Sequence, residues 1–303
     1  MQALAVVIGA FAPGVFWLWL VYRWDRYHPE PRWLVIRTFL WGMVVAIPIA
    51  IAELILMLGG IGMQCLEQLG EAPLSLQSIA YEAFIVAGLT EEAGKFLVVR
   101  LSIYKSLYFD EATDGLVYSA AAALGFATLE NIGYAMSFGW QVMLLRGPIS
   151  TFAHVLFSVV WGYPLGLRKV AYPRSRLYLW LGLPGAMAAH GLFDFLLFTQ
   201  SWYAWLVIPL MGGLAAALVL MLRHSRRISP YREKVAEMQV NCSNCYAKVP
   251  YYANFCPVCG EAVDRNTHRE GNACGNCGAL LGKGAIYCTA CGSRIVKKPW
   301  RKQ

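Results

Sequence analysis

The sequence predicts an all-α polytopic membrane protein of about seven transmembrane helices, followed by a small cytosolic domain of tandem zinc ribbons. Of its 303 residues, 58% are hydrophobic and only 15% are charged. Soluble domains are nearer half apolar and about a quarter charged, so membrane insertion is the simplest interpretation. Long apolar stretches recur through residues 1–222, and eight of the nine cysteines lie between Cys242 and Cys291.

Seven apolar stretches have the length to span, or nearly span, a bilayer. Crossing the hydrocarbon core takes about 20 mostly apolar residues. The second and third stretches are long, so we expect them to tilt, kink or lie partly in the interface. The expected helices cover roughly residues 3–22, 34–59, 79–104, 115–138, 149–167, 177–198 and 203–222.

The distribution of Lys and Arg between the connecting loops predicts the orientation. With seven spans, one side has loops 23–33, 105–114 and 168–176 and the exit from the last helix, and all of these carry Lys or Arg. The loops on the other side carry only Arg146. Short cytoplasmic loops are enriched in these residues. We therefore expect the N-terminus outside and the C-terminal tail in the cytosol.

After a membrane domain of residues 1–222, we expect a linker (223–240), two zinc ribbons (241–293) and a basic tail (294–303). A set of four cysteines recurs after 32 residues, and each set reads C-x2-C-x10-C-x2-C. Two CxxC pairs supply the four thiolates of a closed structural zinc site, so two structural zinc ions are expected. Disulfides or free thiols are the alternative. The proposed ligands are Cys242, Cys245, Cys256, Cys259, Cys274, Cys277, Cys288 and Cys291. This repeat resembles the double zinc ribbon family.

The tail is basic, with 14 Lys and Arg against 5 Asp and Glu in residues 223–303. A basic segment beside a membrane interacts with anionic lipid. Nucleic acid is a less favoured partner, because each zinc with four thiolates carries a formal charge of about −2 and so reduces the positive balance. We expect the ribbons to recruit a cytosolic protein or to dock a substrate.

Ionisable side chains inside the apolar stretches are the main functional signal, because a charge at mid-bilayer is costly. Glu91 and Lys95 are one helical turn apart, so we expect Lys95 to hold one acid of the Glu91–Glu92 pair while the other faces a cavity. Glu53 is alone in its stretch and is assigned no role. The further polar residues are Glu130 and Asn131 in the fourth stretch, His154 and Ser158 in the fifth, and His190 and Asp194 in the sixth.

These residues are expected to meet in one polar layer. At about 1.5 Å per helical residue, Glu91, Glu130, His154 and His190 lie at similar depths below the outer helix ends. A single buried histidine is more often a satisfied core residue, and one ion pair can simply hold helices together. Four helices with polar residues at one depth favour a functional site, and the alternatives are a transport path or a structural polar network.

Taken together, these motifs resemble the PrsW family of intramembrane proteases, which is related to the CAAX prenyl endopeptidases and bacterial Abi proteins. The resemblance covers roughly residues 3–222. The matching motifs are the segment YRWDRYHPEP at 22–31, EExxK at 91–95, FxxxEN at 126–131, His154, and HGLFDF at 190–195, and the segment DGLVY at 114–118 also fits.

The resemblance implies an intramembrane endopeptidase, in the plasma membrane of a prokaryotic cell, that cleaves a membrane-tethered protein or peptide. Glu91 or Glu92 would be the general base. His154 and His190 would bind a catalytic zinc or stabilise the oxyanion of a metal-free reaction. The residues that would orient them are Lys95, Glu130, Asn131 and Asp194.

Two other functions remain open at this stage. The chain would be a non-catalytic scaffold if its zinc ribbons recruit cytosolic partners and the paired glutamates are dispensable. A transporter or channel would need a continuous polar path, whereas the polar positions cluster at one depth.

Overall fold

The computed structural model describes residues 2–67, 75–229, 231, 239–250, 256 and 258–262. The chain divides into two compact units, residues 1–229 and residues 230–303. In the described residues, the regular structure of the first unit is all helical, and the second unit contains a β-hairpin.

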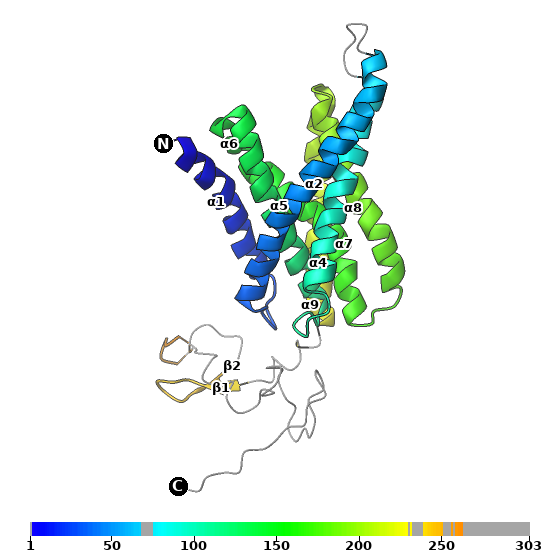
Figure 1. The fold of residues 1–303 in the computed structure, drawn as a ribbon. Coiled ribbons are helices and arrows are strands. Elements are labelled where there is room, and N and C mark those ends of the chain that lie inside the picture. The colour runs from blue at the N-terminus through cyan, green and yellow to red at the C-terminus, as the bar shows by residue number, and fades with distance from the viewer. Residues whose placement is uncertain are drawn as a thin grey trace. The chain divides into compact units, whose positions relative to one another are not determined.

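The helices of the first unit follow the seven predicted apolar stretches (Figure 1). The first two stretches form α1 (Gln2–Tyr22) and α2 (Arg32–Glu67). The third forms a continuous helical run of α3 (Leu76–Ala80), the π-helix η1 (Tyr81–Leu89) and α4 (Thr90–Ser102). The fourth forms α5 (Ala112–Phe138).

The remaining stretches form the second half of the bundle. Short turns η2 (Trp140–Val142), α6 (Met143–Leu145) and the π-helix η3 (Arg146–Ser150) lead into α7 (Thr151–Lys169). They are followed by α8 (Ser175–Phe198), η4 (Trp202–Leu206) and α9 (Val207–Ile228). The last helix therefore extends beyond its expected end at residue 222.

Helix α5 is the central helix of this unit, and its residues from Ala112 to Thr128 are all buried. Glycines let its neighbours approach closely. A Cβ at Gly125 would lie 1.8 Å from the carbonyl oxygen of Phe39 in α2, and one at Gly115 would lie 2.1 Å from that of Gly162 in α7. Small residues allow such backbone contacts between membrane helices. The close packing fixes α2, α5 and α7 against one another.

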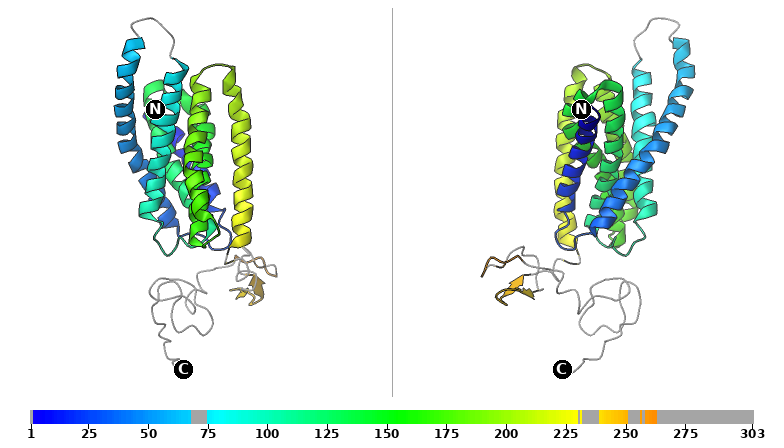
Figure 2. Two further views of the ribbon diagram at one scale, coloured as in Figure 1. Left: turned by 90° about the vertical axis from the view of Figure 1, so that its right-hand side faces the viewer. Right: turned by 60° about the vertical axis from the view of Figure 1, so that its left-hand side comes forward.

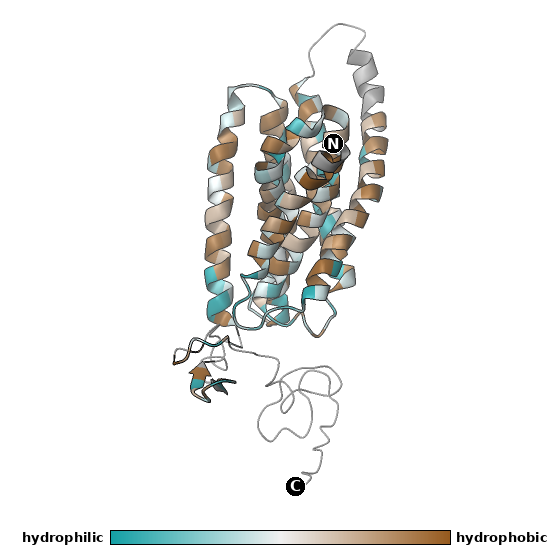
Figure 3. Cartoon of the chain, turned by 90° about the vertical axis from the view of Figure 1, so that its left-hand side faces the viewer, coloured by the Kyte–Doolittle hydropathy of each residue, from teal (hydrophilic) through white to brown (hydrophobic). Residues whose placement is uncertain are grey.

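The outer helices expose apolar side chains, and Figure 3 shows that hydrophobic residues make up much of their length. By length and composition, four described segments can cross a membrane: Arg32–Leu58, Trp140–Lys169, Ser175–Phe198 and Trp202–Ile228. Only 17% of the most apolar window of the first segment and 11% of that of the last are buried inside the protein. The predicted class, an all-α membrane protein, is confirmed, and the exact number of seven spans stays a prediction.

The connections that carry Lys and Arg lie at the same end of the first unit (Figure 2). Arg226 Nη2 donates to the carbonyl oxygen of Trp24 at 2.9 Å, which joins the end of α9 to the loop after α1. Lys169 Nζ donates to the carbonyl oxygen of Ser106 at 3.3 Å, which joins the end of α7 to the loop after α4. This arrangement agrees with the loop pattern in the sequence, while the compartment that this end faces stays a prediction.

The second unit contains strands β1 (Gln239–Asn241) and β2 (Lys248–Pro250), paired antiparallel with Val240 opposite Val249. The first predicted zinc ribbon begins on this hairpin. The second set of predicted ligands, Cys274, Cys277, Cys288 and Cys291, lies outside the described residues.

Candidate functional site

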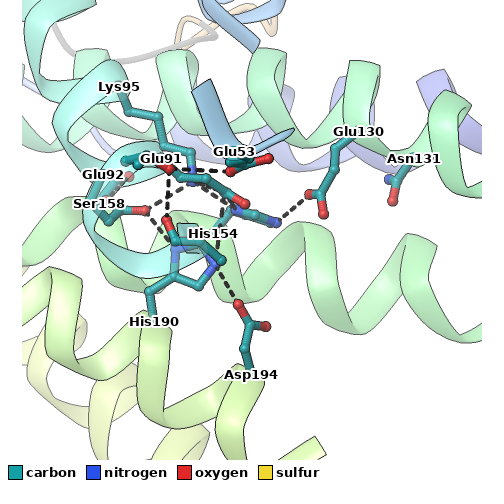
Figure 4. A network of polar contacts seen from close by, with 12 residues as sticks. Glu53, Glu91, Glu92, Lys95, Glu130, Asn131, His154, Ser158, His190 and Asp194 are labelled. Atoms are coloured by element: carbon teal, nitrogen blue, oxygen red, sulfur yellow. Dashed lines mark hydrogen bonds and ion pairs between the residues drawn. The ribbon is translucent and has the colours of Figure 1, made fainter. Parts of the chain in front are cut away.

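Helices α4, α5, α7 and α8 bring the predicted polar residues other than Asn131 together inside the first unit (Figure 4). Glu91, Glu92 and Lys95 come from the first turns of α4, directly after the π-helix η1. His154 comes from the first turn of α7, directly after the π-helix η3. Such π-helical segments are rare in proteins, and those that occur are often found at functional sites. His190 from α8 completes the cluster, and its ring centroid lies 5.1 Å from that of His154.

Lys95 is the centre of the cluster. Its Nζ lies 2.9 Å from Glu91 Oε2, 2.9 Å from Glu92 Oε1 and 2.9 Å from His154 Nδ1. The side chain is fully buried, and its ammonium group lies 4.4 Å from the ring centroid of Phe126. We expected Lys95 to hold one acid, but it contacts both. The reason is geometric, since positions i+3 and i+4 share one face of a helix.

Glu92 is buried completely and both of its oxygens have partners. Ser158 Oγ at 2.8 Å and Trp161 Nε1 at 2.9 Å donate to Oε2. Lys95 and His190 Nδ1, the latter at 3.3 Å, contact Oε1. A carboxylate that accepts this many hydrogen bonds is held rigidly in place. Glu92 therefore fixes the positions of helices α4, α7 and α8 relative to one another.

Glu91 has a different environment although it is adjacent in sequence. Its Oε2 contacts Lys95 and lies 3.6 Å from His154 Nδ1 and 3.8 Å from His190 Nε2. Within the described part of the chain, no residue donates a hydrogen bond to its Oε1. Glu91 also lines a cavity of about 870 Å³, whereas Glu92 and Lys95 are not among the lining residues.

Each histidine is oriented by a second acid. His154 Nε2 lies 2.9 Å from Glu130 Oε2, and His190 Nε2 lies 3.3 Å from Asp194 Oδ2. The ammonium group of Lys95 can only donate, so His154 Nδ1 accepts its hydrogen bond. The predicted His190–Asp194 contact across one turn of helix is present.

The cavity combines acids, histidines and apolar walls. Glu91, Glu130, His154, His190 and Asp194 line it together. Its apolar wall includes Ile47, Leu54, Met57, Phe126, Phe157 and Phe193. Asn131 lies further out, where its Nδ2 donates to Thr151 Oγ1 at 2.9 Å, so the structure does not bring it to the glutamate pair.

Three residues of the site were not predicted from the sequence. Glu53, assigned no role, lines the cavity and accepts a hydrogen bond from Thr90 Oγ1 at 3.2 Å. Its presence as a lone acid in an apolar stretch was the available signal. Arg146, counted only as a loop charge, pairs with Glu130 through its Nη2 at 2.7 Å. The role of Trp161 could not be predicted, because the sequence does not show which acceptor an indole N–H will bond to.

The donor set of the cavity fits a catalytic metal ion. Glu91, His154 and His190 are buried and offer ligand atoms that all lie within 4.8 Å of one another. Two histidines and one glutamate are a common ligand set for catalytic zinc. Because Lys95 Nζ lies 2.9 Å from both Glu91 Oε2 and His154 Nδ1, an ion that used these two atoms would displace the ammonium group from them.

The first zinc ribbon has the geometry of a thiolate site. The sulfur atoms of Cys242, Cys245, Cys256 and Cys259 lie within 4.8 Å of one another. The Cys242–Cys259 and Cys245–Cys256 sulfur pairs are 3.5 and 3.6 Å apart. A disulfide bond is about 2.05 Å long, whereas four sulfurs at about 2.3 Å from a tetrahedral zinc lie about 3.8 Å apart. The arrangement fits zinc and excludes disulfides among these four.

We predict that the Cys242→Ser/Cys245→Ser variant loses one zinc ion per chain, because two remaining thiolates cannot hold a structural zinc. Metal content of the purified full chain, by inductively coupled plasma mass spectrometry, measures the loss. The matched control is Ser243→Ala, which changes an exposed residue between the two cysteines and keeps the wild-type content. An unchanged zinc content in the double cysteine variant would contradict the assignment.

Comparison with known proteins gives matches to two family models. The model of the PrsW family of intramembrane metalloproteases matches residues 30–222, and the double zinc ribbon model matches residues 242–292. No solved structure matches the chain.

Curated relatives match about two thirds of the chain. The Protease PrsW of Geobacillus kaustophilus is 36% identical over 197 residues, which are 65% of this chain and 81% of the relative. That of Bacillus subtilis is 31% identical over 208 residues, 68% of this chain and 89% of the relative. That of Clostridioides difficile is 34% identical over 204 residues, 65% of this chain and 79% of the relative.

Proposed function

Because the chain belongs to the PrsW family of intramembrane metalloproteases, we propose that it hydrolyses a peptide bond of a membrane-tethered protein or peptide in the cavity beside Glu91. The observation that carries the proposal is the difference between the two adjacent glutamates. Glu91 lines the cavity and keeps one oxygen without a hydrogen bond from the described residues, whereas Glu92 is saturated.

Glu91 is suited to be the general base. Water bound beside Oε1 gives a proton to this carboxylate while its oxygen attacks the carbonyl carbon of the substrate. The tetrahedral oxyanion then accepts a hydrogen bond from an imidazole N–H of His190, the type of stabilisation that an oxyanion hole supplies, while His154 is held between Lys95 and Glu130. Collapse breaks the C–N bond, and the leaving amine takes the proton from Glu91.

The surrounding residues position these groups. Lys95 and Glu92 hold the start of α4 against α7 and α8, while Glu130 and Asp194 orient the histidines. When a zinc ion is bound, Glu91, His154 and His190 would hold it; Glu91 would then be a ligand in place of the base, and the ion would supply polarisation of the scissile carbonyl and a lower pKa of bound water.

The walls of the cavity support an apolar substrate segment. Aliphatic and aromatic side chains make most of the lining, and the charged groups beside Glu91 and the histidines are Glu53, Glu82, Glu130, Arg146 and Asp194. A transmembrane segment that is unwound locally would place its apolar side chains on these walls and its backbone at the polar layer. The proposed orientation has the N-terminus outside and the zinc ribbons in the cytosol, where they would bind a protein partner.

The experiment that tests this function compares cells producing the wild-type chain with cells producing the Glu91→Ala/Glu92→Ala variant. We expect mass spectrometry of protein N-termini to detect new termini in or near transmembrane segments only in the wild-type cells. Identical termini in both cell lines, with equal amounts of chain in the membrane, would reject the protease. In that case, loss of partner binding in Cys242→Ser would support the scaffold function instead.

A further inference from the structure

A second group of buried acids lies away from the cavity, at the end of the bundle that carries the basic loops. Asp25 and Glu30 come from the loop after α1, Glu111 immediately precedes α5, and Asp114 is in its first turn. Their exposed fractions are 4%, 2%, 1% and 0%, in that order. None of them takes part in the proposed hydrolysis, and none lines the cavity.

Each of the four carboxyl groups has one oxygen that accepts a hydrogen bond. The backbone N–H of His28 donates to Asp25 Oδ1 at 3.2 Å, and the hydroxyl of Tyr118 donates to Glu30 Oε2 at 2.6 Å. Ser229 Oγ donates to Glu111 Oε2. The backbone N–H groups of Asp110 and Glu111 donate to Asp114 Oδ2 at 2.6 and 2.7 Å.

The other oxygen of each group is buried, and among the described residues no donor outside the four acids reaches it, although Asp25 with Glu111 and Glu30 with Asp114 lie within hydrogen-bond reach of one another. These atoms are Asp25 Oδ2, Glu30 Oε1, Glu111 Oε1 and Asp114 Oδ1. Helix capping does not explain them, because Glu111 and Asp114 form the capping box of α5 and still leave one oxygen each. Buried polar atoms are almost always satisfied in native proteins, so four orphaned oxygens in one place require an explanation.

The oxygens are close enough to coordinate one ion. Asp25, Glu111 and Asp114 each offer an oxygen within 4.8 Å of the other two, and Glu30 is in electrostatic contact with both Asp25 and Asp114. Calcium binds oxygens at about 2.3–2.6 Å, so two ligands on opposite sides of the ion are up to about 5 Å apart. Two basic residues lie nearby: His28 is 3.7 Å from Asp110 Oδ1 and in electrostatic contact with Asp25, and Lys169 is in electrostatic contact with Asp114.

We propose that Asp25, Glu30, Glu111 and Asp114 form a site for a hard divalent cation of the calcium and magnesium class. Carboxylate-only ligands favour such ions, whereas zinc and copper prefer nitrogen or sulfur. The bound ion ties the loop after α1 to the start of α5. Through the Ser229–Glu111 contact it also secures the end of the first unit, directly before the connection to the zinc ribbons.

The rival explanation is a set of carboxyl groups that share protons. Burial raises the pKa of Glu111 to about 10 and raises the pKa of Asp25 above its usual range, so an uncompensated negative charge is costly here. Protons and a cation are alternative ways to offset that charge. A cation site binds added metal and is stabilised by it, whereas a set of shared protons does not respond to metal.

Manganese is the probe that separates them, because it accepts the same oxygen ligands and its free ion has a strong electron paramagnetic resonance signal. We expect the zinc-loaded full chain in detergent to bind manganese at this site, and Glu111→Gln/Asp114→Asn to lose this binding by at least about 100-fold in affinity. His154→Ala/His190→Ala, which removes the cavity donors, keeps it. The cysteine sites of the zinc ribbons are expected to bind little manganese, because manganese has the lowest affinity among the divalent first-row metal ions for such sites.

Thermal unfolding provides the second measurement. It also shows whether a variant has lost metal binding only because it is poorly folded. At an approximately 100-fold excess of calcium over its Kd, the midpoint of the wild type is expected to rise by about 5 °C or more, and that of Glu111→Gln/Asp114→Asn to stay unchanged. Two results would overturn the proposal. One is a wild-type chain that binds neither manganese nor calcium, as the shared-proton network predicts, and the other is a rise of the midpoint in calcium that is equal in the wild type and in the amide variant.

Discussion

Glu91→Gln is expected to lower kcat/KM for peptide-bond cleavage by about 1,000-fold, within the 10²–10⁴ range of a positioned general base. The amide keeps the size of the side chain and can still accept a hydrogen bond from Lys95, but it cannot take a proton from water. We therefore expect the loss mainly in kcat, with the midpoint of thermal unfolding close to that of the wild type. A substrate identified from the cellular comparison serves for the kinetic measurement with purified chain.

Glu82→Gln is the matched control for Glu91→Gln. Glu82 lines the same cavity and the substitution is chemically identical, but its carboxyl group has no contact with His154 or His190 among the described residues. We expect an effect below about 10-fold. If Glu82→Gln were the inactive variant and Glu91→Gln cleaved normally, the base would have to be reassigned.

Glu92→Gln separates the roles of the two neighbours. This change removes a charge that Lys95 and His190 contact and weakens the bonds from Ser158 and Trp161. We therefore expect Glu92→Gln to lower the free energy of unfolding as well as the rate, whereas Glu91→Gln lowers the rate alone. Equal destabilisation by both variants would show that the two acids share one structural role.

Short-range contacts within one helix were the part of the site that sequence could predict. The Glu91–Lys95 and His190–Asp194 contacts each join positions i and i+4, so helical geometry alone places them together. Counting residues from the outer helix ends predicted that the polar residues of four helices lie in one layer. This count works because all spans cross a bilayer of the same thickness. The apolar stretches predicted the positions of the helices because each span of the bilayer needs a run of mostly apolar residues of that length.

Contacts between helices could not be predicted, because they depend on how each helix is rotated about its axis. Glu92 meets Ser158 and Trp161 from a distance of more than 60 positions in sequence, and no periodicity identifies such partners. Glu53 was left without a role for this reason, since its helix could have faced either lipid or the bundle. The second acidic group was also not predicted as a cluster, although three of its members lie in segments 22–31 and 114–118 that matched the family pattern.

Lys95→Met is expected to have the largest effect on stability, lowering the free energy of unfolding by about 3–5 kcal/mol. The methionine fills similar space but removes the ammonium group that lies 2.9 Å from both glutamates and from His154. Two buried carboxylates then lack their shared counter-ion, and the cost of an unpaired buried charge exceeds any gain from a more apolar core. Denaturant-induced unfolding in micelles, followed by tryptophan fluorescence, measures the change. Lys105→Met is the control, because Lys105 is exposed in a loop and its replacement is expected to change little.

The double variant Lys95→Met/Glu92→Gln tests the physical cause of that destabilisation. If the unpaired charge is responsible, replacing the fully buried Glu92 with a neutral amide removes one of the two stranded carboxylates, and part of the lost stability returns. If Lys95 acted only by filling space, the two changes would add and the double variant would be less stable than Lys95→Met alone. Recovery of stability without recovery of cleavage is the expected result, because the rescued fold still lacks the ammonium group that holds Glu91 beside the histidines.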